Sequence, residues 1–198
     1  EGRLLRIMER WCFQWVDHVI VVDNQLLSRS KQSGVACTRI PNYIRPPLHD
    51  KRRSVEARKQ EVSSGLQPPI RLIHSGYQSE ERGLFTMLEL ASILEPNEVS
   101  LALAGRCNYP NARAKAEKLV AKNDARDRVH FIGWESFLPH KQITEEYRQA
   151  DVGLVMWHPN PNHTRIPTKM YEYLHHGLPI ICSDFPLWRD FIERYRCG

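Results

Sequence analysis

The side chains that could bind a diphosphate gather where one expected helix, residues 167–176, begins. They are Thr164, Arg165, Pro167, Thr168, Lys169 and Glu172. Free N–H groups and a partial positive charge at a helix N-terminus attract phosphate groups, and Lys169 adds a mobile cation. Glu172 follows on the same helix face, where its carboxylate can accept two hydrogen bonds from a ribose diol. The plainer alternative is a surface Lys–Glu pair worth about 0.2–0.5 kcal/mol, but its place at the helix start favours a ligand.

A second group of candidates lies in the polar loop that follows the expected strand 70–75. Gly76 lets backbone N–H groups turn inward after Ser75, and Arg82 stands where the next helix begins. A fixed guanidinium at such a place can meet a phosphate. The chain contains neither a GxGxxG motif nor a P-loop, which disfavours nucleotide binding by those routes. Taken alone, the loop is more typical of an ordinary βα turn with a surface arginine.

Both groups need a scaffold, and from residue 70 onward short apolar strands alternate with helices. The expected strands are residues 70–75, 99–104, 129–132, 152–156 and 178–182. The expected helices are residues 84–94, 112–122, 139–149, 167–176 and 186–194. This alternation predicts an α/β fold, a doubly wound parallel sheet covered on both faces. Such a sheet binds ligands beyond the carboxyl ends of its strands. The loops at those ends are residues 75–83, 105–111, 133–139, 157–167 and 183–186.

The first third of the chain has a different pattern. Residues 3–16 place apolar side chains at helical spacing, with arginines along the polar side, which predicts an amphipathic helix. Residues 19–22 predict a short buried strand. The helix could lie on lipid, but packing against a further domain is the favoured interpretation. Prolines and charged residues predict a linker over residues 42–69, which separates residues 1–41 from residues 70–198.

Charge and composition exclude several classes of protein. The net charge is +5, but residues 1–60 carry 12 Lys and Arg against 6 Asp and Glu, and the remainder is close to neutral. A basic excess confined to the first third, without a nucleic-acid motif, disfavours nucleic-acid binding and suits lipid surfaces or anionic acceptors. No apolar run approaches the roughly 18–20 residues of a membrane span. Five cysteines without a CxxC pair argue against a disulfide framework and a zinc site, and they suit the cytoplasm.

Several runs together resemble one enzyme family. The run PTKMYEYL from Pro167 to Leu174, followed by Gly177-Leu178-Pro179, resembles the donor-site signature of family-4 glycosyltransferases (glycosyl transferases group 1), which have the GT-B fold. Three further runs resemble the family in the same order. They are His74-Ser75-Gly76 with Arg82-Gly83, then Leu103-Ala104-Gly105, then Val129 to Trp134. Upstream, residues 17–22 and 40–42 resemble the end of the first domain and the hinge, so the resemblance spans nearly the whole chain.

This resemblance implies two Rossmann-like domains that face a cleft. The C-terminal domain binds a UDP- or GDP-sugar, and the N-terminal domain binds a glycan, a lipid-linked molecule or another hydroxyl acceptor. Transfer in the family needs no metal and retains the anomeric configuration. On this basis residues 70–198 are most of the donor domain, and residues 1–41 are a helix and strand that end the acceptor domain.

The resemblance also implies roles for single residues. Arg82 and Lys169 would be catalytic, because they would neutralise charge on the leaving diphosphate. Glu172 would hold the ribose as the second carboxylate of the family's E-x7-E motif, and Trp134 would lie near the base. The other residues implied to contact the nucleotide are Ser75, Gly76, Thr164, Pro167 and Thr168.

The sequence departs from the family pattern at two places. Thr164 stands where the first Glu of E-x7-E is expected, eight residues before Glu172. The loop's usual phosphate-binding arginine would fall at or beside Gly76, which leaves Arg82 as the cation there. Side chains that could contact the donor sugar instead are His158, Asn160, Asn162 and His163.

Two alternatives to a transferase share this fold. A sugar-nucleotide epimerase would need acid and base carboxylates outside this chain, and the PTKMYEYL run favours the transferase. A non-catalytic module that binds a nucleotide sugar is consistent with the missing first Glu.

The two ends of the chain complete these expectations. Glu1 follows no signal-peptide pattern and Arg196-Cys197-Gly198 does not resemble a natural tail, so we expect a fragment of a longer protein. Such a fragment should bind UDP or GDP weakly without turnover. The expected location is the cytoplasm, where the missing first domain could contact the inner face of the membrane.

Overall fold

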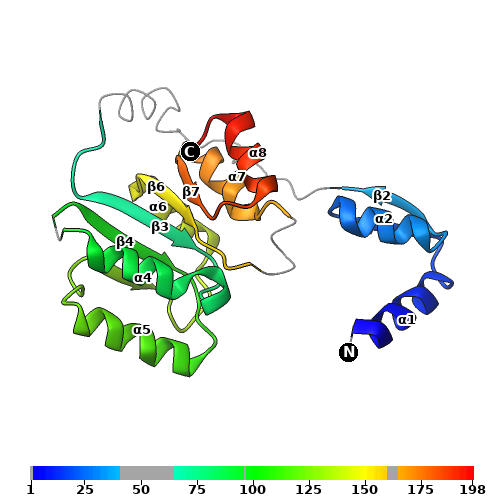
Figure 1. The fold of residues 1–198 in the computed structure, drawn as a ribbon, viewed down its shortest axis with the longest axis horizontal. Helices are drawn as coiled ribbons and strands as arrows, with labels where there is room; N and C mark the ends of the chain where they lie inside the picture. Colours follow the sequence, from blue (N-terminus) through cyan, green and yellow to red (C-terminus); the bar gives the residue numbers. More distant parts are fainter. Residues whose placement is uncertain (1, 41–64, 96, 160–164) are drawn as a thin grey trace. The chain divides into compact units, whose positions relative to one another are not determined.

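The structure is a computed structural model that describes residues 2–40, 65–95, 97–159 and 165–198 (Figure 1). Most of the linker expected over residues 42–69 therefore lies outside the described residues. The chain divides into two compact units, Glu1–Tyr43 and Ile44–Gly198.

The first unit is a helix followed by a parallel β-α-β arrangement. Its elements are α1 (Gly2–Phe13), β1 (His18–Val21), α2 (Asn24–Gln32) and β2 (Ala36–Arg39). The helix and strand predicted from the sequence are present, although α1 ends three residues before the predicted helix. The prediction of a buried strand was wrong, because Val21 alone of the four residues of β1 is buried and Ile20 is exposed. Neither α2 nor β2 was predicted. α2 begins where the Asp23 carboxylate accepts a hydrogen bond of 2.8 Å from the Leu26 N–H, a standard N-cap.

The second unit is a five-stranded parallel sheet in the order β5-β4-β3-β6-β7. Its strands are β3 (Ile70–Ser75), β4 (Val99–Ala104), β5 (Val129–Ile132), β6 (Val152–Val155) and β7 (Ile180–Cys182). Its helices are η1 (Glu80–Arg82), α4 (Leu84–Ile93), α5 (Pro110–Lys122), α6 (His140–Gln149), α7 (Thr168–His175) and α8 (Pro186–Tyr195). The predicted α/β fold, a Rossmann-like doubly wound parallel sheet, is confirmed, with boundaries within about two residues.

Neighbouring residues of β3 face opposite helical layers, which produces two hydrophobic cores. Leu72 and Leu101 pack with α4 and α5, whereas Ile73 and Ala102 pack with α6, α7 and α8 (Figure 1). Burying each leucine or isoleucine side chain among these contributes about 1.5–3 kcal/mol. Strands covered on both faces explain the nearly continuous apolar runs in the sequence.

The order of the strands reverses at β3. The chain runs from β3 outward to β5, then returns so that β6 lies on the other side of β3. The helix after β3 and the helix after β6 therefore cover opposite faces. In open α/β sheets such a switch point opens a crevice at the carboxyl ends of the two strands. Here residues 76–83 and 156–159, which follow these strands, lie together, since the His158 N–H donates to the Glu81 carbonyl oxygen.

Candidate functional site

The two strands at the switch point separate before they end. β3 pairs with β6 at Leu72 and Ile73 but not at His74 or Ser75. The Tyr173 hydroxyl from α7 lies in the gap, where it accepts a hydrogen bond of 3.0 Å from the Ser75 N–H and lies 3.3 Å from the carbonyl oxygens of Ile73 and Leu154. Tyr173 therefore holds the open end of the sheet with hydrogen bonds that a strand pair would otherwise make.

Gly153 makes room for Tyr173. A Cβ atom on Gly153 would lie 2.3 Å from the Tyr173 ring, so the tyrosine packs directly on the backbone of β6. Burial raises the pKa of the Tyr173 hydroxyl. The hydroxyl therefore stays protonated and neutral beneath the site.

Lys169 is a buried cation at this open end. Only 7% of its surface is exposed, and its Nζ lies 3.0 Å from Nε2 of His74, which is fully buried. The other ring nitrogen of His74, Nδ1, lies 3.0 Å from the Leu154 carbonyl oxygen. A carbonyl oxygen can only accept, so Nδ1 carries the ring proton and Nε2 accepts from the lysine.

Burial and neighbouring charge act on both members of this pair. The pKa of Lys169 lies well below its usual value because of burial, and then because of the positive charge of Arg82; Glu172 acts in the opposite direction. The pKa of His74 is likewise lowered, first by burial and then by the charge of Lys169. The imidazole is therefore neutral, and an arriving anion would stabilise the charged form of the lysine.

Gly76 lies next to the ammonium group of Lys169. Its φ of +93° is in the left-handed region that favours glycine, and a Cβ there would contact Lys169 Nζ at 3.8 Å. The loop after β4 lies just as close, since a Cβ on Gly105 would lie 2.0 Å from the Gly76 carbonyl oxygen. Gly76 thus lets the backbone come close to the lysine ammonium, and Gly105 lets the loop after β4 pack on Gly76. The Gly76 N–H itself donates to the Ala104 carbonyl oxygen (2.8 Å), so the predicted role of this loop's N–H groups toward a phosphate stays a prediction.

Arg82 lies between two aromatic rings at the other side of the crevice. Its Cζ is 5.6 Å from the Tyr77 ring centre and 5.2 Å from the Trp157 ring centre. Burial lowers the pKa of the guanidinium. The loop containing Arg82 also contacts the loop after β6, because the His158 N–H donates to the Glu81 carbonyl oxygen (2.9 Å). Contacts with the two rings orient the guanidinium of Arg82, whereas the sequence identified Arg82 only as a cation near a helix start.

Glu172 is held by a tyrosine of α6. The Tyr147 hydroxyl donates to Glu172 Oε2 at 2.7 Å and lies 2.7 Å from Ser75 Oγ. The hydroxyl has one proton, which the carboxylate requires, so the Ser75 hydroxyl donates to Tyr147. Burial raises the pKa of Tyr147. The carboxylate is oriented at one oxygen, which leaves its other oxygen available to a ligand diol.

The start of α7 provides further hydrogen-bond donors. Pro167 is the N-cap residue, with φ −60° and ψ 139°, and no side chain caps the helix. Thr168 is exposed at this end, while Lys169 is buried one position later. An uncapped helix start presents N–H groups and partial positive charge to an anion. Lys169 of this helix thus lies beside His74 and Gly76, and Glu172 is joined to Ser75 through Tyr147. That Pro167, Thr168 and Arg82 share a ligand with them stays a prediction.

Trp134 lies elsewhere in the fold. Its ring is 9% exposed, stacks on Phe131 at 4.3 Å and donates its indole N–H to Glu117 Oε1 at 3.0 Å. The side chain thus belongs to the core beneath α5. Contact between Trp134 and a base stays a prediction.

The proposed sugar-contacting side chains divide into two groups. Thr164, Asn160, Asn162 and His163 lie outside the described residues. His158 is described, and its Nε2 lies 3.1 Å from the Thr86 hydroxyl on α4.

Sequence reasoning missed four side chains that support the site. These are His74, Tyr77, Tyr147 and Trp157. A buried histidine at the end of an apolar strand was the available signal, because a polar ring in such a strand needs a partner. The tyrosine of α6 had no comparable signal, since its partners are 72 and 25 residues away in the sequence.

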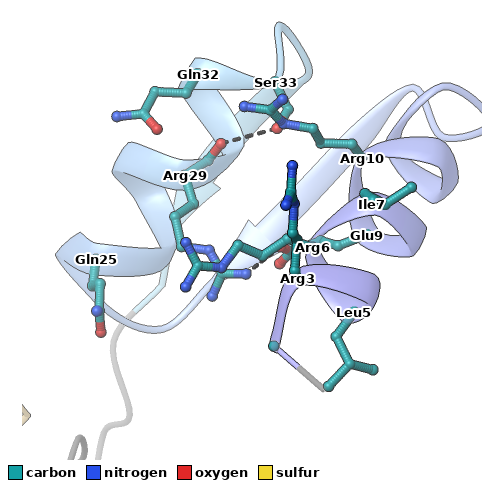
Figure 2. Close-up of a pocket in the computed structure, with 11 residues that line it drawn as sticks. Arg3, Leu5, Arg6, Ile7, Glu9, Arg10, Gln25, Arg29, Gln32 and Ser33 are labelled. Carbon is teal, nitrogen blue, oxygen red and sulfur yellow. Dashed lines mark hydrogen bonds and ion pairs between the residues drawn. The ribbon is translucent and has the colours of Figure 1, made fainter.

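The first unit contains a separate basic cavity of about 890 Å3 between α1 and α2 (Figure 2). Its lining includes the side chains of Arg3, Arg6, Arg10 and Arg29, together with Glu9. Arg29 forms an ion pair with Glu9. This cavity has an excess of positive charge, but it has neither the buried cation nor the carboxylate–tyrosine arrangement of the switch-point crevice.

Residues 56–198 match the model of a protein family described as glycosyl transferases group 1. The chain belongs to this family. The match includes every element from β3 to α8. The buried Lys169 and the stacked Arg82 therefore lie in the part of the chain that matches the family. No curated protein matches this sequence.

Solved structures show the same fold. HepE from Anabaena, solved in complex with UDP and glucose, is 16% identical with a TM-score of 0.65, and the match covers 92% of this chain and 48% of HepE. WaaG, a glycosyltransferase involved in lipopolysaccharide biosynthesis, is 18% identical with a TM-score of 0.61, covering 90% and 47%. Sucrose-phosphate synthase from Thermosynechococcus elongatus is 19% identical with a TM-score of 0.59, covering 90% and 43%. The family member described here thus spans about half the length of these proteins.

Two further features concern metals and membranes. In the described part of the chain, no cluster of three or more His, Cys, Asp or Glu side chains is arranged to hold a metal ion. None of the described helices is long and apolar enough to cross a bilayer.

Proposed function

We propose that this chain provides the donor half of a glycosyltransferase that transfers a sugar, of the hexosyl type, from UDP or GDP to a hydroxyl acceptor. The observation that carries the proposal is the buried Lys169, held next to Gly76 at the switch-point crevice. A buried ammonium is costly unless a negative charge accompanies it during function. Arg82 and the uncapped start of α7 add donors around the same crevice, and HepE, which has this fold, was solved with UDP.

The chemistry follows from where charge develops. When the bond between the anomeric carbon and the diphosphate breaks, negative charge grows on the leaving oxygens. Lys169 and Arg82 stabilise that charge in a site shielded from water, where electrostatic interactions are strongest. No metal is required for this task, and retention of configuration follows from the family resemblance.

Glu172 has a binding role in this proposal. Its free oxygen accepts hydrogen bonds from the ribose hydroxyls while Tyr147 holds the other oxygen. Ser75, Gly76, Pro167 and Thr168 supply the backbone and side chains around the diphosphate. Contacts from Thr164 and Trp134 to the nucleotide complete the set that the resemblance implies.

The acceptor belongs to the other half of the enzyme. We propose a glycan or a lipid-linked acceptor, bound in the cytoplasm at the inner face of the membrane. The basic lining of the α1–α2 cavity, Arg3, Arg6 and Arg10, supports an acceptor or a lipid surface with negative charge. The 198-residue chain should accordingly bind the donor without turnover.

Calorimetric titration of the chain with UDP and with GDP tests the donor assignment. We expect binding of one of them, and a loss of about tenfold or more in Lys169→Ala and Glu172→Ala, because each removes a charge-assisted hydrogen bond. The matched controls are Lys141→Ala on α6 and Glu89→Ala on α4, two exposed side chains away from the crevice. Equal affinity in all four variants and the parent would contradict the assignment.

A non-catalytic nucleotide-sugar-binding module is the second candidate, because Thr164 replaces the first Glu of the family motif. A screen of sugar nucleotides with the full-length parent protein separates the two functions. Release of UDP or GDP in the presence of acceptor supports the transferase, whereas binding without release supports the module.

A further inference from the structure

His74 is a buried histidine that no function described so far uses. It is fully buried at the end of β3, and the family resemblance gives it no role. Its ring connects two elements, because Nδ1 lies 3.0 Å from the Leu154 carbonyl oxygen on β6 and Nε2 lies 3.0 Å from Lys169 Nζ on α7. The first contact fixes the tautomer, so Nε2 presents a lone pair to the lysine.

We propose that His74 is the positioning residue for Lys169: its Nε2 lone pair holds the lysine ammonium beneath Gly76, aimed at the diphosphate before the nucleotide arrives. The proposal rests on the donor-binding function proposed above. Lys169 has four rotatable side-chain bonds, and fixing them in advance removes an entropy cost from ligand binding. The closeness of Nζ to the Gly76 backbone shows where the fixed ammonium is directed.

A neutral acceptor suits this task better than a carboxylate would. A carboxylate partner would neutralise the ammonium and compete with the phosphate for it. An imidazole lone pair stabilises the charged lysine while the net charge stays positive. The other charged groups that act on Lys169 are Arg82 from η1, which disfavours its protonation, and Glu172 from α7, which favours it.

This role has a signature in pH. Because hydrogen bonding to the charged form favours that form, removing Nε2 should lower the pKa of Lys169 further. At low pH the lysine would remain charged without the histidine, and at high pH it would lose its proton and with it the attraction for phosphate. His74 itself stays neutral in this range, since burial lowers its pKa.

The test compares UDP affinity at pH 6.5 and pH 8.5 for the full chain and two variants. His74→Phe keeps a flat ring but removes the acceptor, whereas His74→Gln keeps an acceptor oxygen near the place of Nε2. We expect His74→Phe to bind UDP about tenfold more weakly at pH 8.5 and nearly normally at pH 6.5, and His74→Gln to remain within about twofold at both. The phosphate of UDP titrates near pH 6 in every variant alike, so it cancels in the comparison.

Three outcomes would overturn the proposal. The first is an unchanged UDP affinity in His74→Phe. The second is an equal loss of affinity in His74→Phe at both pH values, which indicates a merely structural role. The third is a His74→Gln variant that binds UDP as weakly as His74→Phe. The control is His130→Phe, an exposed histidine of the same sheet. Thermal unfolding verifies that the variants fold. If His74→Phe is unstable, the comparison of His74→Gln with the unmodified chain still tests the proposal.

A second readout separates this proposal from the donor assignment. If the unmodified chain binds neither UDP nor GDP, the proposed function fails. The His74 ring can still be examined by 15N NMR without ligand. We expect a proton on Nδ1, none on Nε2 between pH 6.5 and 8.5, and a changed Nε2 resonance in Lys169→Met. A proton on Nε2, or an Nε2 resonance unaffected by Lys169→Met, would contradict the positioning role by itself.

Discussion

The Tyr147 hydroxyl lies 2.7 Å from Glu172 Oε2, and it joins two helices that are adjacent on one face of the sheet. The same hydroxyl lies 2.7 Å from Ser75 Oγ at the end of β3. One tyrosine therefore couples the carboxylate that we propose to bind the ribose to the start of the loop that we propose to cover the diphosphate. Each of the following expectations tests one such relationship.

Tyr147→Phe should destabilise the second unit by about 1–3 kcal/mol, because Glu172 Oε2 loses the tyrosine donor and the buried Ser75 hydroxyl is left with the longer 3.3 Å contact to the Tyr173 hydroxyl. UDP affinity should fall as well, since the carboxylate is no longer oriented. Chemical denaturation and calorimetry measure the two effects. Tyr195→Phe, at an exposed tyrosine of α8, is the matched control and should change neither quantity. Unaltered stability in Tyr147→Phe would show that the hydrogen bonds contribute nothing net.

Gly153→Ala tests the packing of Tyr173 on β6. The new methyl group would lie 2.3 Å from the ring, so the tyrosine or the strand must move, at a cost of about 1–3 kcal/mol. Displacement of Tyr173 also removes the hydrogen bond to the Ser75 N–H. Urea unfolding measures the loss. Gly2→Ala, where a Cβ meets nothing within 4 Å, is the control, and a Gly153→Ala protein as stable as this control would contradict the packing argument.

Arg82→Ala should weaken UDP binding by about tenfold to a hundredfold, since it removes a charged donor from the crevice. Arg82→Lys should recover only part of this affinity, because the lysine keeps the charge but not the planar contact with Tyr77 and Trp157. Calorimetry with UDP measures both. An Arg82→Lys variant indistinguishable from the unmodified chain would show that stacking does not orient the cation.

Lys169→Met should make the protein more stable at neutral pH while it loses nucleotide affinity. The pKa of Lys169 is lowered in the folded state, mainly by burial, so the unfolded chain binds the proton more tightly. The unfavourable contribution of the lysine is therefore present at low pH and disappears as pH rises from the lowered pKa toward about 10.4, the value in the unfolded chain. The stability advantage of the variant, followed by denaturation from pH 6 to 10, should shrink with rising pH.

A constant stability difference across that range would contradict the pH argument. Lys141→Met, at an exposed lysine of α6, serves as control, and its stability should follow that of the unmodified chain across the same pH range.

Local sequence signals were sufficient for the sheet, and together with the sheet rule they led to the candidate site that we propose. Apolar runs ending in small residues located β3 to β7, and the rule for open parallel sheets directed attention to loops 75–83 and 157–167. The cations Lys169 and Arg82 were identified because their positions at helix starts suit phosphate. The match to the glycosyl transferases group 1 family covers this part of the chain.

The supporting contacts could not be predicted, because they join residues far apart in the sequence. Lys169 and His74 are 95 residues apart, and Ser75 and Tyr173 are 98 apart. The unpredicted α2 and β2 had a local signal that went unused: Asp23 as N-cap and Gly34 at φ +77° after the helix. The hydrogen bond from the Trp134 indole to Glu117, 17 residues away, likewise had no local signal in the sequence.

The most direct test of the account is a crystal structure of the chain with UDP. The account places the diphosphate at the switch point, with a phosphate oxygen within about 2.7–3.2 Å of Lys169 Nζ and further contacts from Arg82 and the N–H groups at the start of α7. A diphosphate bound among Arg3, Arg6 and Arg10 of the first unit, with the crevice between β3 and β6 empty, would contradict it.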